Sequence, residues 1–197
     1  MSGERPISRF PVADVAALPD DLRGPIEEIA AKTGFVPNVF TALAHRPAEL
    51  RAFMAYHDAL MDPPAGTASG LTKAEREMIV VATSGRNDCL YCVVSHGAIL
   101  RLRSKRPHLA DQLAINPAEA DLSERERAIV ELAIKVAVDS AHVSQADLDA
   151  ARAAGLDDDE IWDVGAIAAF FAMSNRLANM AAIRPNPEFY ALGRDVG

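Results

Sequence analysis

The chain has 197 residues, a formal net charge of −8 and a hydrophobic share of 50%, which fits one domain with a substantial apolar core. The acidic balance argues against nucleic-acid binding, because that function requires a basic surface. Two cysteines are too few for a secreted disulfide scaffold. The sequence shows neither an apolar signal core nor an apolar run long enough to span a bilayer. We therefore expect a soluble, cytoplasmic protein that binds neither nucleic acid nor membranes.

The N-terminal third predicts an extended arm followed by short helices. Residues 1–20 contain several prolines that prevent a regular helix, so this segment is expected to be an arm. Helical periodicity then runs from 21 to 32, where Gly34 stops it. Further helices are expected at 38–43 and 47–61, before a loop rich in proline and glycine.

A helix pair is predicted at 71–104. Thr72 and Glu75 have the spacing of a capping box, so a helix is expected to begin there and to end near Gly85. Asn87 or Asp88 is expected to cap the next helix, which runs to about residue 103 and carries both cysteines. A connecting region that contains two prolines follows.

The second half repeats part of this pattern. Ser123 and Glu126 form another predicted capping box, offset by 51 residues from the first. Helices are expected after this box, at 145–154 and at 158–183, so residues 122–184 resemble a second, non-catalytic repeat of the helix-pair unit. Strand-like alternation is not found anywhere. The sequence therefore predicts one all-α domain with a weak internal repeat.

The cysteines form a CxxC motif on a predicted helix. Cys89, Cys92 and His96 are spaced i, i+3 and i+7, so their side chains share one helical face. Cys89 lies near the helix N-terminus, where free N–H groups favour a thiolate. Glu77 is on the preceding helix, and an antiparallel turn would bring it to His96. These four residues are the candidate catalytic site: a redox thiol pair with a carboxylate–imidazole proton relay.

Other interpretations of the same residues remain open. Two cysteines, a histidine and a glutamate are a permissible zinc ligand set, although ligands on a single helical face lie too nearly in a line. A non-enzymatic redox sensor or a zinc-stabilised helical module would use the same side chains. His57 could approach the site but is expected to be a packing or surface residue. Asn175 is expected to form hydrogen bonds between helices or subunits.

The spacing Glu77-x11-Cys89-x-x-Cys92-x3-His96 resembles that of the alkyl hydroperoxidase D-like (AhpD-like) proteins of the carboxymuconolactone decarboxylase superfamily. Segments 34–40, 44–47 and 170–178 resemble its peroxidase-related branch. The resemblance implies an all-helical AhpD-like fold and a homo-oligomer, either a trimer or a hexamer. It also implies peroxiredoxin-type reduction of hydroperoxides without a cofactor, using a dithiol or lipoyl-type protein as the reductant.

Within that resemblance, Glu77 and His96 correspond to the proton relay and the two cysteines to the redox pair. We expect Cys92 to be the peroxidatic cysteine, because it is nearer His96, and Cys89 to resolve the sulfenate. The chain departs from well-characterised members at Tyr91, where they carry a second histidine; a phenol with a pKa near 10 cannot shuttle protons at neutral pH. The superfamily also permits a decarboxylase-like lyase, although that chemistry needs no thiol pair.

Overall fold

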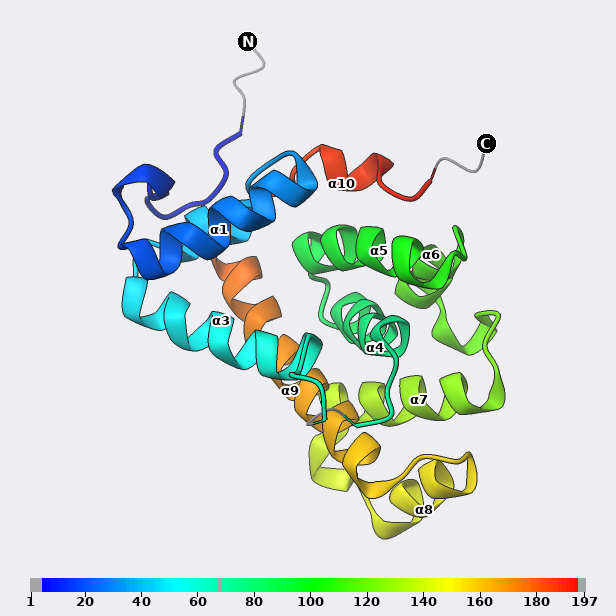
Figure 1. The fold of residues 1–197 in the computed structure, drawn as a ribbon. Helices are drawn as coiled ribbons and strands as arrows, with labels where there is room; N and C mark the ends of the chain where they lie inside the picture. Colours follow the sequence, from blue (N-terminus) through cyan, green and yellow to red (C-terminus); the bar gives the residue numbers. More distant parts are fainter. Residues whose placement is uncertain (1–4, 67–68, 195–197) are drawn as a thin grey trace.

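The computed structural model describes residues 5–66 and 69–194, and within these ranges it contains helices and loops but no β-strand (Figure 1). The prediction of an all-α protein is therefore confirmed for the described part of the chain. The α-helices are α1 (Asp20–Thr33), α2 (Asn38–Leu43), α3 (Pro47–Met61), α4 (Lys73–Arg86), α5 (Leu90–Ser104), α6 (Leu109–Ile115), α7 (Glu124–Asp139), α8 (Gln145–Ala153), α9 (Asp158–Ala181) and α10 (Glu188–Ala191). Short 3-10 helices lie at Val15–Ala17, Pro117–Glu119 and Ser140–His142.

Most helix ends follow local signals in the sequence. α3 begins with Pro47 at its first position, as predicted. α1 ends where Gly34 adopts the left-handed conformation with a φ of 86°. Both predicted capping boxes are present, at the starts of α4 and α7. Each of these signals acts within about one helical turn, so the sequence alone is enough to place them.

Three short elements lie where the sequence patterns indicate only connections or an arm. α6 occupies the predicted connection after α5, α10 follows the end of the last predicted helix, and the 3-10 helix Val15–Ala17 interrupts the arm. α6 and α10 both pack against α5. Tertiary packing, rather than local propensity, accounts for helices this short. Residues 1–4 of the arm and 67–68 of the expected loop lie outside the described residues.

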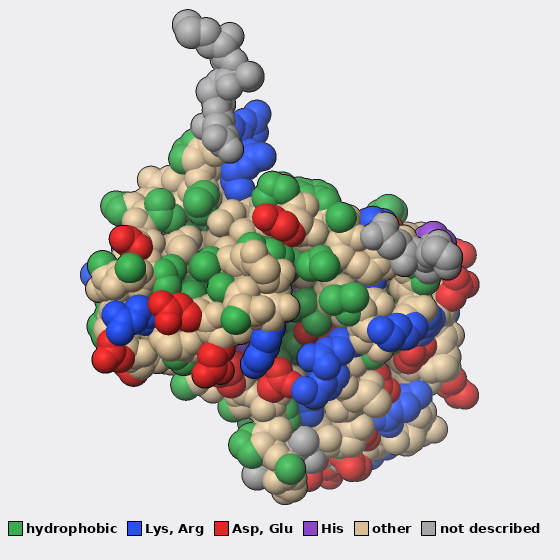
Figure 2. Space-filling model, turned by 45° about the horizontal axis from the view of Figure 1, so that its top comes forward, with side chains coloured by type: hydrophobic (Ala, Val, Ile, Leu, Met, Phe, Trp, Pro, Cys, Tyr) green, Lys and Arg blue, Asp and Glu red, His purple; other side chains and the backbone are tan. Residues whose placement is uncertain are grey.

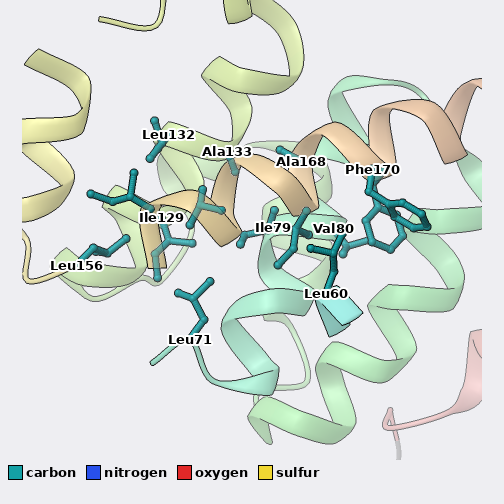
Figure 3. Packing of buried hydrophobic residues seen from close by; sticks show 14 of the residues in the cluster. Leu60, Leu71, Ile79, Val80, Ile129, Leu132, Ala133, Leu156, Ala168 and Phe170 are labelled. Carbon is teal, nitrogen blue, oxygen red and sulfur yellow. The ribbon is translucent and has the colours of Figure 1, made fainter. Parts of the chain in front are cut away.

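Helix α4 is the centre of the fold. It packs against α5, α6, α7 and α9 (Figure 1), and every residue from Glu75 to Ser84 is buried. Figure 3 shows Ile79 and Val80 of α4 in one cluster with Ile129 of α7 and Ala168 of α9. Because these residues are enclosed on all sides, water cannot solvate a charged side chain among them, and such a side chain needs a partner within the protein.

The buried start of α4 nevertheless carries charged side chains at three consecutive positions. Glu75 and Glu77 are each 7% exposed and Arg76 is 2% exposed. Arg125 of α7 donates through Nε to Oε1 of Glu75 at 2.9 Å, and Arg76 donates through Nη2 to Oδ2 of Asp163 of α9 at 2.8 Å. The partner of Glu77 lies in α5 and is described below. Each charge therefore joins α4 to a different helix.

The arm and the C-terminal end of α9 lie side by side. The Arg9 N–H donates to the carbonyl of Ala181 at 2.8 Å, and the Arg184 N–H donates to the carbonyl of Ile7 at 3.0 Å. Nearby, the Asn38 N–H at the start of α2 donates to Oδ1 of Asn186 at 2.8 Å. These bonds hold the arm and α2 over the end of α9, which is where the cysteines lie.

Two helices with matching starts support the idea of an internal repeat. α4 and α7 begin with capping boxes 51 residues apart and pack against each other. The positions that correspond to Cys89 and Cys92 are Ser140, in a 3-10 helix, and Val143, in the loop before α8. We retain the division into a helix pair at 71–104 and a second half at 122–184 as a proposal.

The surface carries charges of both signs. On the face shown in Figure 2, acidic, basic and hydrophobic side chains are interspersed. Ion pairs such as Arg46–Glu49 and Arg51–Asp21 contribute to this mixture. Among the described helices, none combines the length and the apolar character that crossing a bilayer requires.

We predict that Gly85→Ala destabilises the protein, because an added Cβ would lie 2.7 Å from the backbone oxygen of Ala114 in α6. The neighbouring group is backbone and cannot rotate away, so the expected loss in the free energy of unfolding is about 1–3 kcal/mol. Gly165→Ala in α9 is the matched control, since a Cβ there meets nothing within 4 Å, and it should stabilise by about 0.5–1 kcal/mol. Urea denaturation measures both changes; equal effects would contradict a close α4–α6 contact.

Candidate active site

The turn between α4 and α5 places Cys89 at the N-cap of α5. Asp88 adopts a left-handed conformation with a φ of 51°, and the Cys89 N–H donates to the carbonyl of Ser84 at 3.0 Å. The prediction that Asn87 or Asp88 caps this helix is wrong. Because Asp88 is left-handed, the N-cap is the next residue, Cys89, and α5 begins at Leu90. No side chain caps the N-terminus of this helix. The free N–H groups of the first turn therefore remain available to the Cys89 sulfur.

Both cysteines are free thiols in a dry environment. Cys89 is 1% exposed and Cys92 is 2% exposed. They belong to an apolar cluster that includes Ala42 of α2 and Ala178 of α9. Burial in such surroundings disfavours a thiolate, so any ionised sulfur here depends on nearby donors.

The hydrogen bond between the two thiols shifts their pKa values in opposite directions. The pKa of Cys89 is lowered, first by a hydrogen bond with the Cys92 thiol and then by bonds from backbone groups of Cys92 and Tyr91 and from the Asn175 amide. The pKa of Cys92 is raised well above its ordinary value, first by the same bond with Cys89 and then by burial. Negative charge is therefore favoured on Cys89. This ordering differs from the expectation that Cys92, being nearer His96, is the reactive thiolate.

Glu77 and His96 form the predicted pair. Glu77 Oε2 lies 2.8 Å from Nδ1 of His96, and their side chains are only 9% and 13% exposed. The His96 ring also meets Phe171 of α9 edge to face, with ring centroids 4.8 Å apart. A carboxylate that accepts from Nδ1 leaves Nε2 as the free nitrogen of the neutral ring. In the described residues, His96 is not among the groups that hydrogen bond to either sulfur.

Tyr91 has a structural role in this arrangement. It is buried, and its hydroxyl oxygen accepts from the Val39 N–H at 3.2 Å. Burial raises the pKa of the phenol further above its ordinary value. Tyr91 therefore ties α2 to α5 and does not exchange protons at neutral pH.

The remaining histidines fall into two groups. His57 of α3 lies beside the site, with its ring centroid 6.5 Å from that of His96, and its Nδ1 is 3.1 Å from Oδ1 of Asp58. His45 lies elsewhere, stacked on Phe10. The expectation that His57 could approach the site and serve in packing is therefore confirmed, since its ring also lies against those of Phe170 and Phe171.

The expectation that Asn175 forms hydrogen bonds between helices is confirmed, and these bonds make a polar network behind the thiols. Asn175 of α9 is completely buried and hydrogen bonds to Ser84 and Asn87 of the α4–α5 turn. Its amide is among the groups that lower the pKa values of both cysteines. An asparagine inside the apolar run of α9 is the only local signal for this contact.

A groove lies next to the thiol cluster. It has a volume of about 460 Å³ and is lined mainly by apolar side chains of α2, α3 and α9. Ala42 and Ala181 belong to both the groove wall and the cluster that encloses the thiols. The zinc interpretation gains no support, because the described residues contain no group of three or more His, Cys, Asp or Glu side chains arranged to hold a metal ion.

Comparisons with known proteins agree with this geometry. The model of the carboxymuconolactone decarboxylase family matches residues 47–108, the segment that contains α3, α4 and α5. Curated proteins give no match to the chain.

Similar solved structures cover nearly the whole chain. An uncharacterized peroxidase-related protein from Ralstonia eutropha JMP134, described as an alkylhydroperoxidase AhpD core, is 56% identical over 98% of this chain and 99% of its own, with a TM-score of 0.94. An uncharacterized peroxidase-related protein from Silicibacter sp. TM1040 is 37% identical over 98% and 100%, with a TM-score of 0.89. The apo debrominase Bmp8 is 17% identical over 94% and 95%, with a TM-score of 0.70, and shares the fold. With this identity over its full described length, the chain belongs to the AhpD-like proteins of the carboxymuconolactone decarboxylase superfamily.

Proposed function

We propose that this protein is a thiol-dependent peroxidase that reduces hydroperoxides through a dithiol–disulfide cycle of Cys89 and Cys92. The observation that carries the proposal is the buried thiol pair, with negative charge favoured on Cys89, on the same helix as the His96–Glu77 pair. Peroxide reduction needs a thiolate, a second thiol and a proton source, roles that we assign to Cys89, Cys92 and His96.

The first step is attack of the Cys89 thiolate on the terminal oxygen of the hydroperoxide. The O–O bond breaks, Cys89 becomes a sulfenic acid and the leaving alkoxide takes a proton to become an alcohol. Protonated His96 supplies that proton from Nε2 to the leaving oxygen, directly or through a water, and then takes a proton back from the solvent. Glu77 keeps the imidazole oriented through its contact with Nδ1.

The second step forms the disulfide. The Cys92 sulfur attacks the Cys89 sulfenic acid, an S–S bond forms and water leaves with the Cys92 proton. A dithiol, either small or carried on a lipoyl-type protein, then reduces the disulfide by two electrons and is itself oxidised to a disulfide. The neighbouring structures named as peroxidase-related support this assignment of the reaction class.

We also propose that the protein works as a homo-oligomer, a trimer or a hexamer. On α9, Met173, Leu177 and Met180 lie on one face at i, i+4 and i+7 and are 41%, 36% and 56% exposed. All three also line the apolar groove. An exposed apolar strip of this kind is typical of a surface that another subunit covers.

Replacing either cysteine should stop turnover. With dithiothreitol as the reductant, the wild-type protein should consume cumene hydroperoxide continuously, whereas Cys89→Ser should consume none. Without dithiothreitol, which would itself reduce a sulfenate, Cys92→Ser should consume about one equivalent and retain a Cys89 sulfenate that dimedone labels and mass spectrometry locates. Equal rates in all three proteins would refute the thiol cycle, and decarboxylation of a lactone by the double serine variant would instead indicate a decarboxylase-like lyase. A sulfenate on Cys92 in Cys89→Ser would reverse the assignment of the two sulfurs.

Removing the charge of Glu77 should impair proton delivery. We expect Glu77→Gln to lower peroxide turnover by about 10²-fold, the usual scale for loss of general acid–base catalysis. Glu75→Gln is a matched control, because Glu75 lies on the same helix, is equally buried and is also ion-paired. Its turnover should remain near that of the wild type in the folded protein. Similar losses in both variants would assign Glu77 a role in stability alone.

Charges on the exposed strip of α9 should disrupt the oligomer. We expect Leu177→Glu with Met180→Glu to shift the mass measured by light scattering towards that of one chain, because burying two carboxylates is costly. Val138→Glu is the control, since Val138 is 57% exposed on α7, away from this strip. An unchanged mass in the double variant would remove α9 as the interface.

A further inference from the structure

Asn175 is a buried amide in the apolar part of α9. Its side chain is 0% exposed, and it lies between Phe171 and Ala178, which are both buried. A buried amide costs free energy unless its donors and acceptor are bonded. The contacts of Asn175 therefore indicate why a polar side chain occupies this position.

Two hydrogen bonds fix the orientation of the amide. Asn87 Nδ2 donates to Oδ1 of Asn175 at 3.0 Å, and Nδ2 of Asn175 donates to Oγ of Ser84 at 3.0 Å. An amide nitrogen carries two N–H groups, so one N–H remains after the bond to Ser84. That remaining N–H is available to a further acceptor, and the Asn175 side chain is among the groups that lower the pKa values of both cysteines.

The segment that carries Cys89 is held by the same helix. The Cys89 N–H donates to the carbonyl of Ser84 at 3.0 Å, and Nδ2 of Asn179 donates to the carbonyl of Asn87 at 2.9 Å. Two asparagines of α9, one turn apart, thus contact this turn. Asn179 is exposed, whereas Asn175 is buried and is among the groups that lower the pKa values of the two cysteines.

We propose that Asn175, buried against the turn that carries Cys89, is a positioning residue whose side-chain amide stabilises negative charge on the Cys89–Cys92 pair. This inference adds a residue to the thiol cycle proposed above, and it rests on that pair being redox-active. In an otherwise apolar cluster, a fixed neutral donor favours the thiolate without introducing a second buried charge.

The donor acts on only part of the cycle. When the pair is a thiol and a thiolate, the N–H bonds to a charged sulfur, which is a strong acceptor. When the pair is a disulfide, the charge has gone and the same bond is weak. Asn175 therefore stabilises the reduced form relative to the oxidised form, so the disulfide is easier to reduce than it would be without the amide.

The experiment measures thiolate content, which requires no peroxide turnover. The reduced protein is alkylated with iodoacetamide from pH 5 to pH 10, and mass spectrometry gives the rate at Cys89. Asn175→Leu removes the donor at similar volume, and Asn175→Asp keeps the acceptor for Asn87 but places a carboxylate beside the sulfur. Both should lower the alkylation rate at pH 7 at least about tenfold and move the profile to higher pH.

Asn179→Leu is the matched control. It removes an asparagine from the same helix and frees the same turn, but it touches neither sulfur. Its alkylation profile should coincide with that of the wild type. An unchanged profile in both Asn175 variants, or an equal shift in Asn179→Leu, would overturn the proposal.

A second variant protects the test against misfolding. If the Asn175 variants do not fold, Ser84→Ala removes the competing acceptor and leaves both amide N–H groups free for the sulfurs, so alkylation at pH 7 should become faster; an equal or slower rate would overturn the proposal. Failure to reduce peroxide with a shifted Asn175 profile would reject the proposed function but keep this inference. Peroxide reduction together with an unshifted alkylation profile would support the proposed function and reject this inference.

Discussion

The structure depends on the pairing of charged side chains at the buried start of helix α4. The start of α4 carries Glu75, Arg76 and Glu77, and all three are buried among other helices. An unpaired charge in that position costs several kcal/mol, so each must find a partner. The partners come from three different helices: Arg125 of α7, Asp163 of α9 and His96 of α5. The pairs therefore fix how α5, α7 and α9 are rotated about α4, a specificity that apolar packing alone would not provide.

One of these three pairs, Glu77 with His96, is also the proposed proton relay. The contact of Glu77 with His96 sets the rotation of α5, and the rotation of α5 determines where its first turn points. Cys92 is one turn before His96 on the same face, and Cys89 begins that face at the N-cap. The ion pair that satisfies a buried carboxylate thus also positions the thiols. For this reason the loss of Glu77 is expected to affect both stability and chemistry, and an equally buried glutamate is needed to separate the two.

The sequence was sufficient for those parts of the site that depend on short-range geometry. The spacing of Cys89, Cys92 and His96 places them on one face of any α-helix, and an antiparallel turn brings Glu77 to them. It was insufficient where a contact depends on distant segments. Asn175 contacts Asn87 of the α4–α5 turn, from which it is separated by 88 positions in the sequence, and nothing local indicates which helix face Asn175 occupies. Tyr91 similarly acquires its role from Val39, which only the packing of α2 reveals.

The site balances two opposing requirements on the same sulfurs. Enclosure in an apolar cluster raises the pKa of a thiol, yet peroxide chemistry needs a thiolate. The fold resolves this conflict with donors that carry no charge: the N–H groups at the start of α5, the Cys92 thiol and the Asn175 amide. Because none of them is a cation, the charge on Cys89 is stabilised without being neutralised. In the proposed cycle this charge leaves Cys89 when the thiolate is oxidised to the sulfenic acid, so the dry cluster holds a charged sulfur only before the peroxide reacts.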